Sequence, residues 1–495
     1  MPSSAADATP NVVLYNLREN AGETQQDVAE ALNALGAKYG RPLAITANQV
    51  SRWERGITGA TPFYRKLLAE HFGVSVAELG LTRPRVTSSP RAETADVFAI
   101  RSDTNEPEMP RRVVESQQQW RTTRRALNAH RVALAREAVR LYDAELRIGT
   151  TGLIAPPSWL PSAPLELAAF GVALDSAASE PDVTGTEDAS AHTRPLASEE
   201  RRYARYSQAI RDVDHPRLFE NRLAWRLTGV DWDQADAALT FSTSTYFGMV
   251  DTAEAFAHEM AAQHLTGTAG GISPASWRGL TFRRHLGDPF DLHRRALVSS
   301  TDTLTIRLDA DGATFVLHNR SAGNVAVAGG MLHIMPAGVF QPSSILPAAQ
   351  AADFDLWRNI MREYSEEFLG NAEHGGDGNP ADYAAEPLAS FEAARTTGRI
   401  RVYCLGVALD ALTLYGELLT VAVFEGETYD RLFVDMVDSN DEGVVVKTGK
   451  VQPTSALPFT RHVLDELAHG GRLAPAAAGC LELAWQHRHT ILGRN

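Results

Sequence analysis

Three polar residues in one short segment have side chains that can read DNA bases. Asn48, Gln49 and Arg52 lie in TANQVSRWERG, which predicts a helix that begins after a capping Thr46 and ends at Gly56. Asn and Gln pair bidentately with adenine, and Arg pairs with guanine. Because a recognition helix presents its N-terminal residues to base edges, these types at these positions predict binding of double-stranded DNA.

Two amphipathic helices must position these side chains. Val50 and Trp53 are three residues apart, so we expect both to pack inward when the polar residues face outward. An earlier helix is predicted over 24–32, with a capping Thr and an apolar face at helical spacing. Gln26, at the N-terminal end of that helix, and Arg55 are the expected phosphate contacts.

Residues 11–82 resemble the phage-repressor (XRE) type of helix-turn-helix domain. The resemblance rests on TQQDVAEAL, ANQVSRWERG and YRKLLAEHFGVSVAELG, in that order. The DNA-facing positions that it implies are Gln26, Asn48, Gln49 and Arg52. It also implies that Trp53 and Glu54 are structural, and that the protein binds paired half-sites as a homodimer.

The segment LGAKYGRPLAI stands between the two helices, where this family has a short turn. The insertion either lengthens the first helix or forms a wing. An ordinary helical bundle is the alternative interpretation of the whole segment, because polar residues face outward on most helices.

A second cluster of chemistry-bearing residues lies in REYSEE. On a helix, Glu363 is three and four residues from Glu366 and Glu367, so the three carboxylates lie along one edge. Such a cluster repels itself unless a cation binds, and hard oxygen ligands suit Mg²⁺, which neutralises phosphate charge. The alternative is a solvated acidic helix.

Residues 362–367 resemble the core of the Nudix box, Arg-Glu-aliphatic-any-Glu-Glu. Pro336-Ala337-Gly338 stands where that family has its Pro-Gly-Gly turn. The resemblance implies an α/β/α domain over residues 301–492. The Mg²⁺ ligands that it implies are Glu363, Glu366 and Glu367. It makes Arg362 a structural partner and, if the domain is an active enzyme, gives catalytic roles to Glu363 and to Glu417, the latter as general base.

The box is incomplete. Ala348 and Phe354 stand at the positions of its first Gly and first Glu, and Leu369 stands at the position of its last Gly. The loop before Arg362 is also longer than in the family. These departures favour a sensor of a nucleotide-like or phosphorylated small molecule over a hydrolase.

The distribution of charge and composition along the chain suggests several domains and a linker. The net charge of −14 is uneven, because residues 11–85 and 111–147 are slightly basic and the acidic excess follows residue 148. We expect a linker over 83–110, which is rich in Pro, Ser and acidic residues, and a helical or mixed region of unknown fold over 111–300. Residues 175–199 lack aromatic side chains and are expected to be disordered.

The remaining periodicity predicts α/β structure. Apolar residues recur every seven positions in the long helix predicted over 111–147, which either packs on its own domain or forms a dimer seam. Alternating patterns predict strands over 303–341. A helix over 353–369, two further strands and a terminal helix follow, so the fold class is multidomain, α plus α/β.

The sequence excludes some classes of protein. It has no run of about 18 apolar residues and no basic, apolar N-terminal leader, so we expect neither a membrane partner nor secretion. Cys404 and Cys480 are expected to be reduced core residues of a cytoplasmic, nucleoid-associated protein.

Three functional hypotheses remain. The first is a transcriptional regulator whose C-terminal domain senses a nucleotide-like effector. The second is a Mg²⁺-dependent hydrolase of a nucleoside diphosphate derivative, fused to a DNA-binding domain. The third is a scaffold that binds a protein partner.

Overall fold

The computed structural model describes most of the chain and places it in two compact units. The described residues are 11–21, 23–38, 45–54, 62–74, 79, 109–216, 219–232, 238–266, 271–320, 331–371, 374, 380–434, 436, 443–446 and 456–493. One unit comprises residues 1–104 and the other residues 105–495; they are called the head and the body. Almost all of the expected linker, 83–110, lies outside the described residues.

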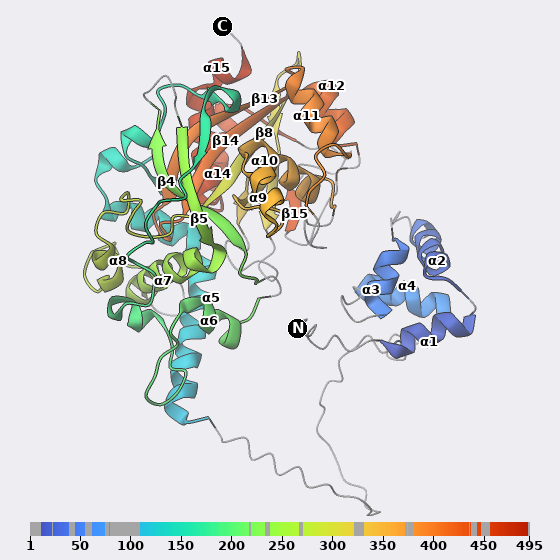
Figure 1. Ribbon diagram of the computed structural model, residues 1–495, viewed down its shortest axis with the longest axis horizontal. Helices are drawn as coiled ribbons and strands as arrows, with labels where there is room; N and C mark the ends of the chain where they lie inside the picture. The colour runs from blue at the N-terminus through green and yellow to red at the C-terminus, as the bar shows by residue number, and fades with distance from the viewer. Residues whose placement is uncertain are drawn as a thin grey trace, which may run out of the picture. The chain divides into compact units, whose positions relative to one another are not determined.

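The head contains a small bundle of helices (Figure 1). Its described helices are α1 (Val12–Ala21), α2 (Gln25–Lys38), α3 (Ala47–Glu54) and α4 (Pro62–Phe72). The buried core of this unit includes Leu14, Val28, Ala29, Leu32, Ile45, Val50, Trp53, Leu67, Leu68, Ala69 and Leu79. Because α2 continues to Lys38, the first residues of the inserted segment lengthen this helix, which was one of the two alternatives.

The body is built on a large mixed sheet. Its strands in order are β1 (Leu153–Ile154), β13 (Ile400–Asp410), β14 (Gly416–Glu425), β8 (Ser299–Leu308), β9 (Ala313–Phe315) and β16 (Leu457–Pro458). At its margins, β12 (Ala337–Val339) pairs with β8, and β2 (Leu165–Glu166) pairs with β13. β14 and β8 are parallel, and their neighbours run antiparallel. Most residues of β8 and β14 are buried, because helices cover both faces of the sheet.

Helices α10 (Leu356–Glu363) and α14 (Pro475–Gln486) lie on opposite faces of this sheet (Figure 1). Asn359 of α10 donates from Nδ2 to Thr301 Oγ1 at 2.9 Å. On the other face, a Cβ added to Gly479 of α14 would lie 3.5 Å from Leu419 of β14. Since successive residues of a strand point to opposite faces, residues 301, 303 and 305 of β8 face α10.

Three smaller sheets complete the body. One consists of β3 (Gly171–Leu174), β5 (Ala238–Thr245) and β4 (Leu223–Asp231); the others are β11 (Leu332–His333), β10 (Leu317–Arg320) and β15 (Gly443–Val446), and the pair β6 (Leu265–Thr266) and β7 (Gly271–Ile272). The remaining helices are α5 (Arg111–Ala138), α6 (Tyr206–Val213), α7 (Tyr246–His264), α8 (Thr281–Leu286), α9 (Pro347–Asp353), α11 (Leu388–Thr396), α12 (Gly426–Leu432), α13 (Arg461–His469) and α15 (Arg488–Leu492).

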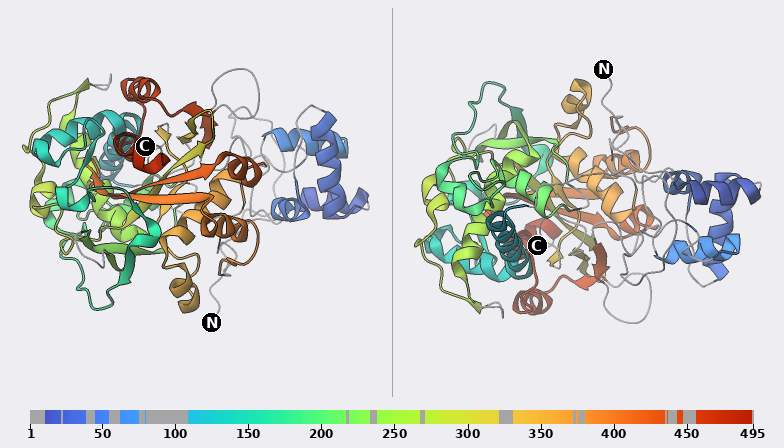
Figure 2. Two further views of the ribbon diagram at one scale, coloured as in Figure 1. Left: turned by 90° about the horizontal axis from the view of Figure 1, so that it is seen from above. Right: turned by 90° about the horizontal axis from the view of Figure 1, so that it is seen from below.

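The chain on the two sides of residue 300, where a domain boundary was expected, belongs to one compact unit. β1 and β2, from residues 153–166, pair with β13 of the large sheet. β4 is also bonded to the chain just before β8, because Leu227 N donates to Leu297 O at 2.8 Å. Figure 2 shows the helices of residues 111–290 gathered at one end of the body and α10 to α12 at the other. At the level of a mixed α/β chain with N-terminal helices, the predicted fold class is confirmed.

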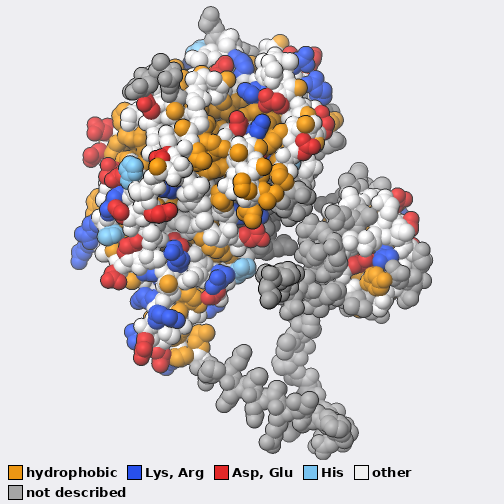
Figure 3. Space-filling view, viewed as in Figure 1, with side chains coloured by type: hydrophobic (Ala, Val, Ile, Leu, Met, Phe, Trp, Pro, Cys, Tyr) orange, Lys and Arg blue, Asp and Glu red, His pale blue; other side chains and the backbone are white. Residues whose placement is uncertain are grey.

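Helix α5 packs on its own unit, which was the first of the two expectations for it. Its heptad residues Val113, Trp120, Leu127 and Leu134 are buried. Figure 3 shows side chains of both charges over the end of the body where α5 lies, and apolar side chains over the face near α9 and β5. Within the described parts of the chain, no helix is long and apolar enough to cross a membrane.

The prediction of disorder over residues 175–199 is wrong. This segment contains the short helix Asp188–Thr193, and Val183, Ser190 and Thr193 are buried. Local polar bonds and contact with α5 order this segment. Glu187 accepts from the backbone N–H of Thr184 at 2.6 Å, and Trp120 Nε1 of α5 donates to Thr193 O at 2.9 Å.

A buried ion-pair cluster fastens α5 to α7. Glu254 of α7 accepts from Arg124 Nη1 at 2.9 Å and from Arg131 Nη2 at 2.6 Å, and all three side chains are at most 5% exposed. Burial alone would raise the pKa of Glu254, but Arg131 and Arg124 together hold that pKa below its ordinary value of 4.5. Arg124 also pairs with Asp214, directly after α6, at 3.1 Å.

We expect Glu254→Gln to lower the free energy of unfolding of the full chain by about 3–5 kcal/mol at pH 7, because two buried guanidinium groups lose their counter-charge. A group with a lowered folded pKa stabilises above its unfolded pKa, so the wild type should lose this contribution as the pH falls below 4.5. Urea unfolding at pH 7 and pH 4 measures both effects.

The control is Glu115→Gln, which changes an exposed partner of Arg111 on α5 and should leave stability unchanged. Equal unfolding midpoints for Glu254→Gln and this control would contradict the role of the cluster.

Candidate nucleic-acid interface and carboxylate site

Each of the two predicted DNA-binding helices begins at its predicted Thr cap. Asp27 N donates to Thr24 Oγ1 at 3.2 Å before α2, and Gln49 N donates to Thr46 Oγ1 at 3.4 Å before α3. Gln49 Oε1 in turn accepts from Thr46 N at 3.2 Å, which completes a reciprocal capping box. Both capping predictions are confirmed.

The carboxylate of Glu54, the last residue of α3, joins three helices. It accepts from Arg18 Nε of α1 at 2.6 Å and from Gln25 Nε2 of α2 at 2.7 Å, with Arg18 and Glu54 both nearly buried. Val50 and Trp53 lie in the core, as predicted, at 0% and 4% exposure. The family pattern implied a structural Glu54, but the sequence offered no signal for Arg18, which is 36 residues away.

A second pair of hydrogen bonds, between Asn33 and Ile45, holds the start of α3 to α2. Asn33 Oδ1 accepts from Ile45 N at 2.8 Å, and Asn33 Nδ2 donates to Ile45 O at 2.9 Å. The amide therefore pairs with one residue's backbone as a neighbouring strand would. This contact fixes the direction in which the chain enters α3, despite the insertion between the two helices.

The structure describes the side chains of two of the expected DNA-facing residues, Gln26 and Gln49. Gln26 and Gln49 are exposed, and Gln26 Nε2 donates to Glu30 Oε1 at 2.8 Å. Asn48 and Arg52 belong to α3, but their side chains lie outside the described residues, as does all of Arg55. Assignment of these residues to base and phosphate contacts stays a prediction.

In the body, two of the three predicted carboxylates meet one stretch of backbone. α10 ends at Glu363 and continues as a π-helical turn, Tyr364–Phe368. Glu367 Oε1 accepts from Ala337 N at 3.3 Å. The Glu363 carboxylate lies against Gly338, where an added Cβ would overlap it.

The third carboxylate points elsewhere. Glu366 Oε1 accepts from His374 N at 2.8 Å, beyond the end of the π-helical turn. In the described part of the chain, no group of three or more His, Cys, Asp or Glu side chains is arranged to hold a metal ion. The three-carboxylate Mg²⁺ site therefore stays a prediction.

Pro336 lies in a bend directly before β12. Ala337 and Gly338 begin β12, opposite Asp302 and Thr301 of β8. Pairing with β8 satisfies the backbone of this segment, and Gly338 lets Glu363 approach it closely.

Arg362 is buried and fully engaged in the protein. It lies 3.3 Å from Asp353 Oδ1, donates to Tyr383 Oη at 2.6 Å, and donates to the Gln341 carbonyl at 2.6 Å. These contacts tie α10 to α9 and to the segment after β12, which is a structural role. Asp353, the partner, directly precedes Phe354.

Glu417 lies on the opposite face of the sheet from Glu363, the other residue to which the family pattern gives a catalytic role. It aligns with Ser300 in the sheet, and Ser300 Oγ lies 2.7 Å from Glu417 Oε2 and 2.6 Å from Asp302 Oδ2. These even-numbered positions of β8 point away from α10 and Glu363. Burial, and next the charge of Asp302, raise the pKa of Glu417 well above 4.5. Because Glu417 lies on the opposite face of the sheet from Glu363, it is poorly placed to be the base.

Comparison with models of protein families and with curated proteins gave no match.

We expect Glu417→Gln to unfold like the wild type in mildly acidic solution and to become the more stable of the two as the pH rises. A raised folded pKa contributes stability below the unfolded value of 4.5 and loses it as the pH rises toward the folded pKa. Gln keeps the hydrogen bonds without that loss. Denaturant unfolding from pH 5 to pH 9 measures how far the stabilities of the two proteins diverge.

Glu425→Gln, an exposed change on the same strand, serves as the control and should run parallel to the wild type. Parallel curves for Glu417→Gln and the wild type would show that Glu417 is ionised in the folded protein.

Proposed function

We propose that this protein is a DNA-binding regulator of transcription in which α3 enters the major groove. The observation that carries the proposal is the set of hydrogen bonds that the Glu54 carboxylate accepts from Arg18 and Gln25. It holds α1, α2 and α3 together while Val50 and Trp53 point inward. The opposite side of α3, which includes the exposed Gln49, is then left for base edges.

We further propose that the body senses a nucleotide-like or phosphorylated small molecule together with Mg²⁺, in the manner of a Nudix-like domain. Support comes from Glu363 and Glu367, which reach the same backbone segment from one edge of a helix. Two carboxylates at one place favour a hard cation, which would bring phosphate oxygens with it. Effector binding can change DNA binding only if the effector prefers one of two states.

Binding is favoured over hydrolysis by the position of Glu417. Hydrolysis needs a group near the carboxylates that takes a proton from water. Glu417 faces the other side of the sheet, away from Glu363 and Glu367. The hydrolase hypothesis would thus require a base from another part of the chain.

Replacing Asn48, Gln49 and Arg52 together with Ala should abolish sequence preference in DNA binding. Each bidentate pair with a base contributes about 1–3 kcal/mol, so we expect affinity for a preferred site to fall at least 100-fold. A gel-shift titration against a fragment recovered by mapping bound genomic DNA measures this loss at a fixed salt concentration.

The matched control replaces Asn16 of α1 and Lys38 of α2, which are both exposed, with Ala. It removes an amide and a cation from the head, as the triple variant does, but leaves α3 intact and should keep the affinity and the preference. The assignment of α3 fails if the triple variant keeps them as well.

Glu363→Gln with Glu367→Gln should remove stabilisation of the chain by Mg²⁺ plus ADP in a thermal unfolding assay. The wild type should unfold at a higher temperature with both ligands than with either alone, because bound ligand stabilises the native state. Glu482→Gln, a half-buried change on α14, should behave as the wild type. Equal shifts for all three proteins would argue against a carboxylate-bound cation.

A further inference from the structure

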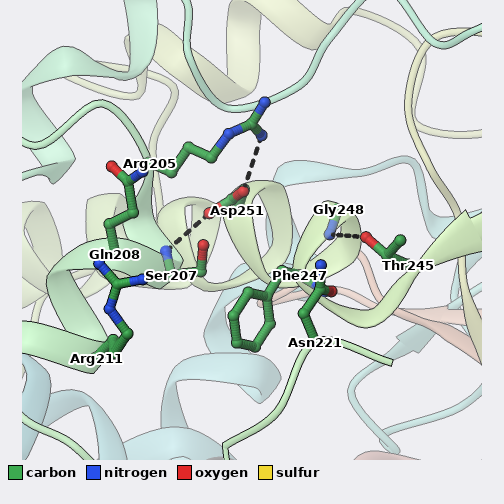
Figure 4. Close-up of a pocket in the computed structure, with 9 residues that line it drawn as sticks. All are labelled: Arg205, Ser207, Gln208, Arg211, Asn221, Thr245, Phe247, Gly248 and Asp251. Atoms are coloured by element: carbon green, nitrogen blue, oxygen red, sulfur yellow. Dashed lines mark hydrogen bonds and ion pairs between the residues drawn. The ribbon is translucent and has the colours of Figure 1, made fainter. Parts of the chain in front are cut away.

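A pocket of about 370 Å³ lies between α6 and the N-terminal end of α7, on elements separate from the carboxylate site. Figure 4 shows Arg205, Ser207, Gln208 and Arg211 on one side and Asn221, Thr245 and Gly248 on the other, with Asp251 between them. All of these are charged or hydrogen-bonding groups apart from Gly248. Phe247 is the one apolar side chain among the residues that line the pocket.

The charged groups of this pocket leave a cation available for a ligand. Asp251 is buried, and both of its oxygens are occupied, by Ser207 N at 2.7 Å and by Arg205 Nη1 at 3.1 Å. Arg211 pairs with its neighbour Asp212, at 2.8 Å, and both side chains are at least 40% exposed. An exposed pair of this kind contributes little, so an anion in the pocket can compete for Arg211.

One neutral group, the side-chain amide of Asn221, is oriented to donate. Asn221 Oδ1 accepts from Phe247 N at 2.9 Å at the start of α7. The amide orientation is thereby fixed, which leaves Asn221 Nδ2 as the donor end. Gln208 adds a second amide, and the positive end of the 19-residue helix α7 adds to the favourable potential for an anion.

One wall is apolar. The ring of Phe247 stacks on that of Phe219, with centroids 4.5 Å apart. We propose that this pocket binds a small organic anion, with its carboxylate or phosphate group held by Arg211, Gln208 and Asn221 and its apolar part against Phe247. The site is independent of the DNA-binding proposal, since it lies wholly within the body.

Titration of the full chain with inorganic phosphate, pyrophosphate and citrate by calorimetry tests the site. We expect at least one of these anions to bind, and its identity distinguishes a phosphate from a carboxylate ligand. Arg211→Gln and Gln208→Glu should each weaken that binding about 10-fold or more, because one removes a charge-assisted hydrogen bond and the other adds a negative charge.

Two controls repeat these changes outside the pocket. Arg140→Gln alters another exposed arginine that pairs with a nearby glutamate, and Gln119→Glu alters an exposed amide on α5. Both should bind as the wild type does. The proposal is overturned if no anion binds the wild type, or if the pocket variants, folded by their melting temperatures, bind as tightly as the controls.

Discussion

The arrangement of the head depends on one buried carboxylate. Glu54 ends α3 and accepts hydrogen bonds from Arg18 of α1 and Gln25 of α2. A charge buried in this way is stable only while its partners surround it, so the contact tolerates few other positions of the three helices. Inward packing of Val50 and Trp53 follows, and so does the outward side of α3 on which the proposed function rests.

The body also contains a buried carboxylate that joins helices. Glu254 lies between Arg124 and Arg131, and joins α5 to α7. Arg124 also reaches Asp214 after α6, so the two helices that line the anion pocket are both fastened to α5. An effector that moved α6 relative to α7 would act on this cluster, because Glu254 follows Asp251 by one helical turn on α7.

Local patterns predicted the elements whose signals are local. The Thr caps of α2 and α3, the inward Trp53, the long strands β13 and β14 and the terminal helix all follow from spacing along the chain. Contacts between distant residues left no such signal. Arg18 with Glu54, Asn33 with Ile45 and the pairing of β1 with β13 depend on how the chain closes on itself.

The candidate site in the body was predictable only in part, for the same reason. The sequence placed Glu363 and Glu367 on one helix edge, but it could not show that Gly338 would meet Glu363 or that Glu417 would face the other side. A strand's register decides the face, and register is a property of the whole sheet. The order of residues 175–199 also depends on a distant contact, because Trp120 Nε1 donates to Thr193 O, 73 residues away, in addition to the local bond of Glu187.

The central claim is that α3 reads DNA sequence. Its most direct test is selection of bound duplexes from a random library by the full-length protein, followed by sequencing. The account predicts a short motif that recurs as an inverted repeat, with half-site centres about one helical turn, or roughly 10 base pairs, apart or a multiple of it. Recovery of duplexes without any enriched motif, or of none above background, would contradict it.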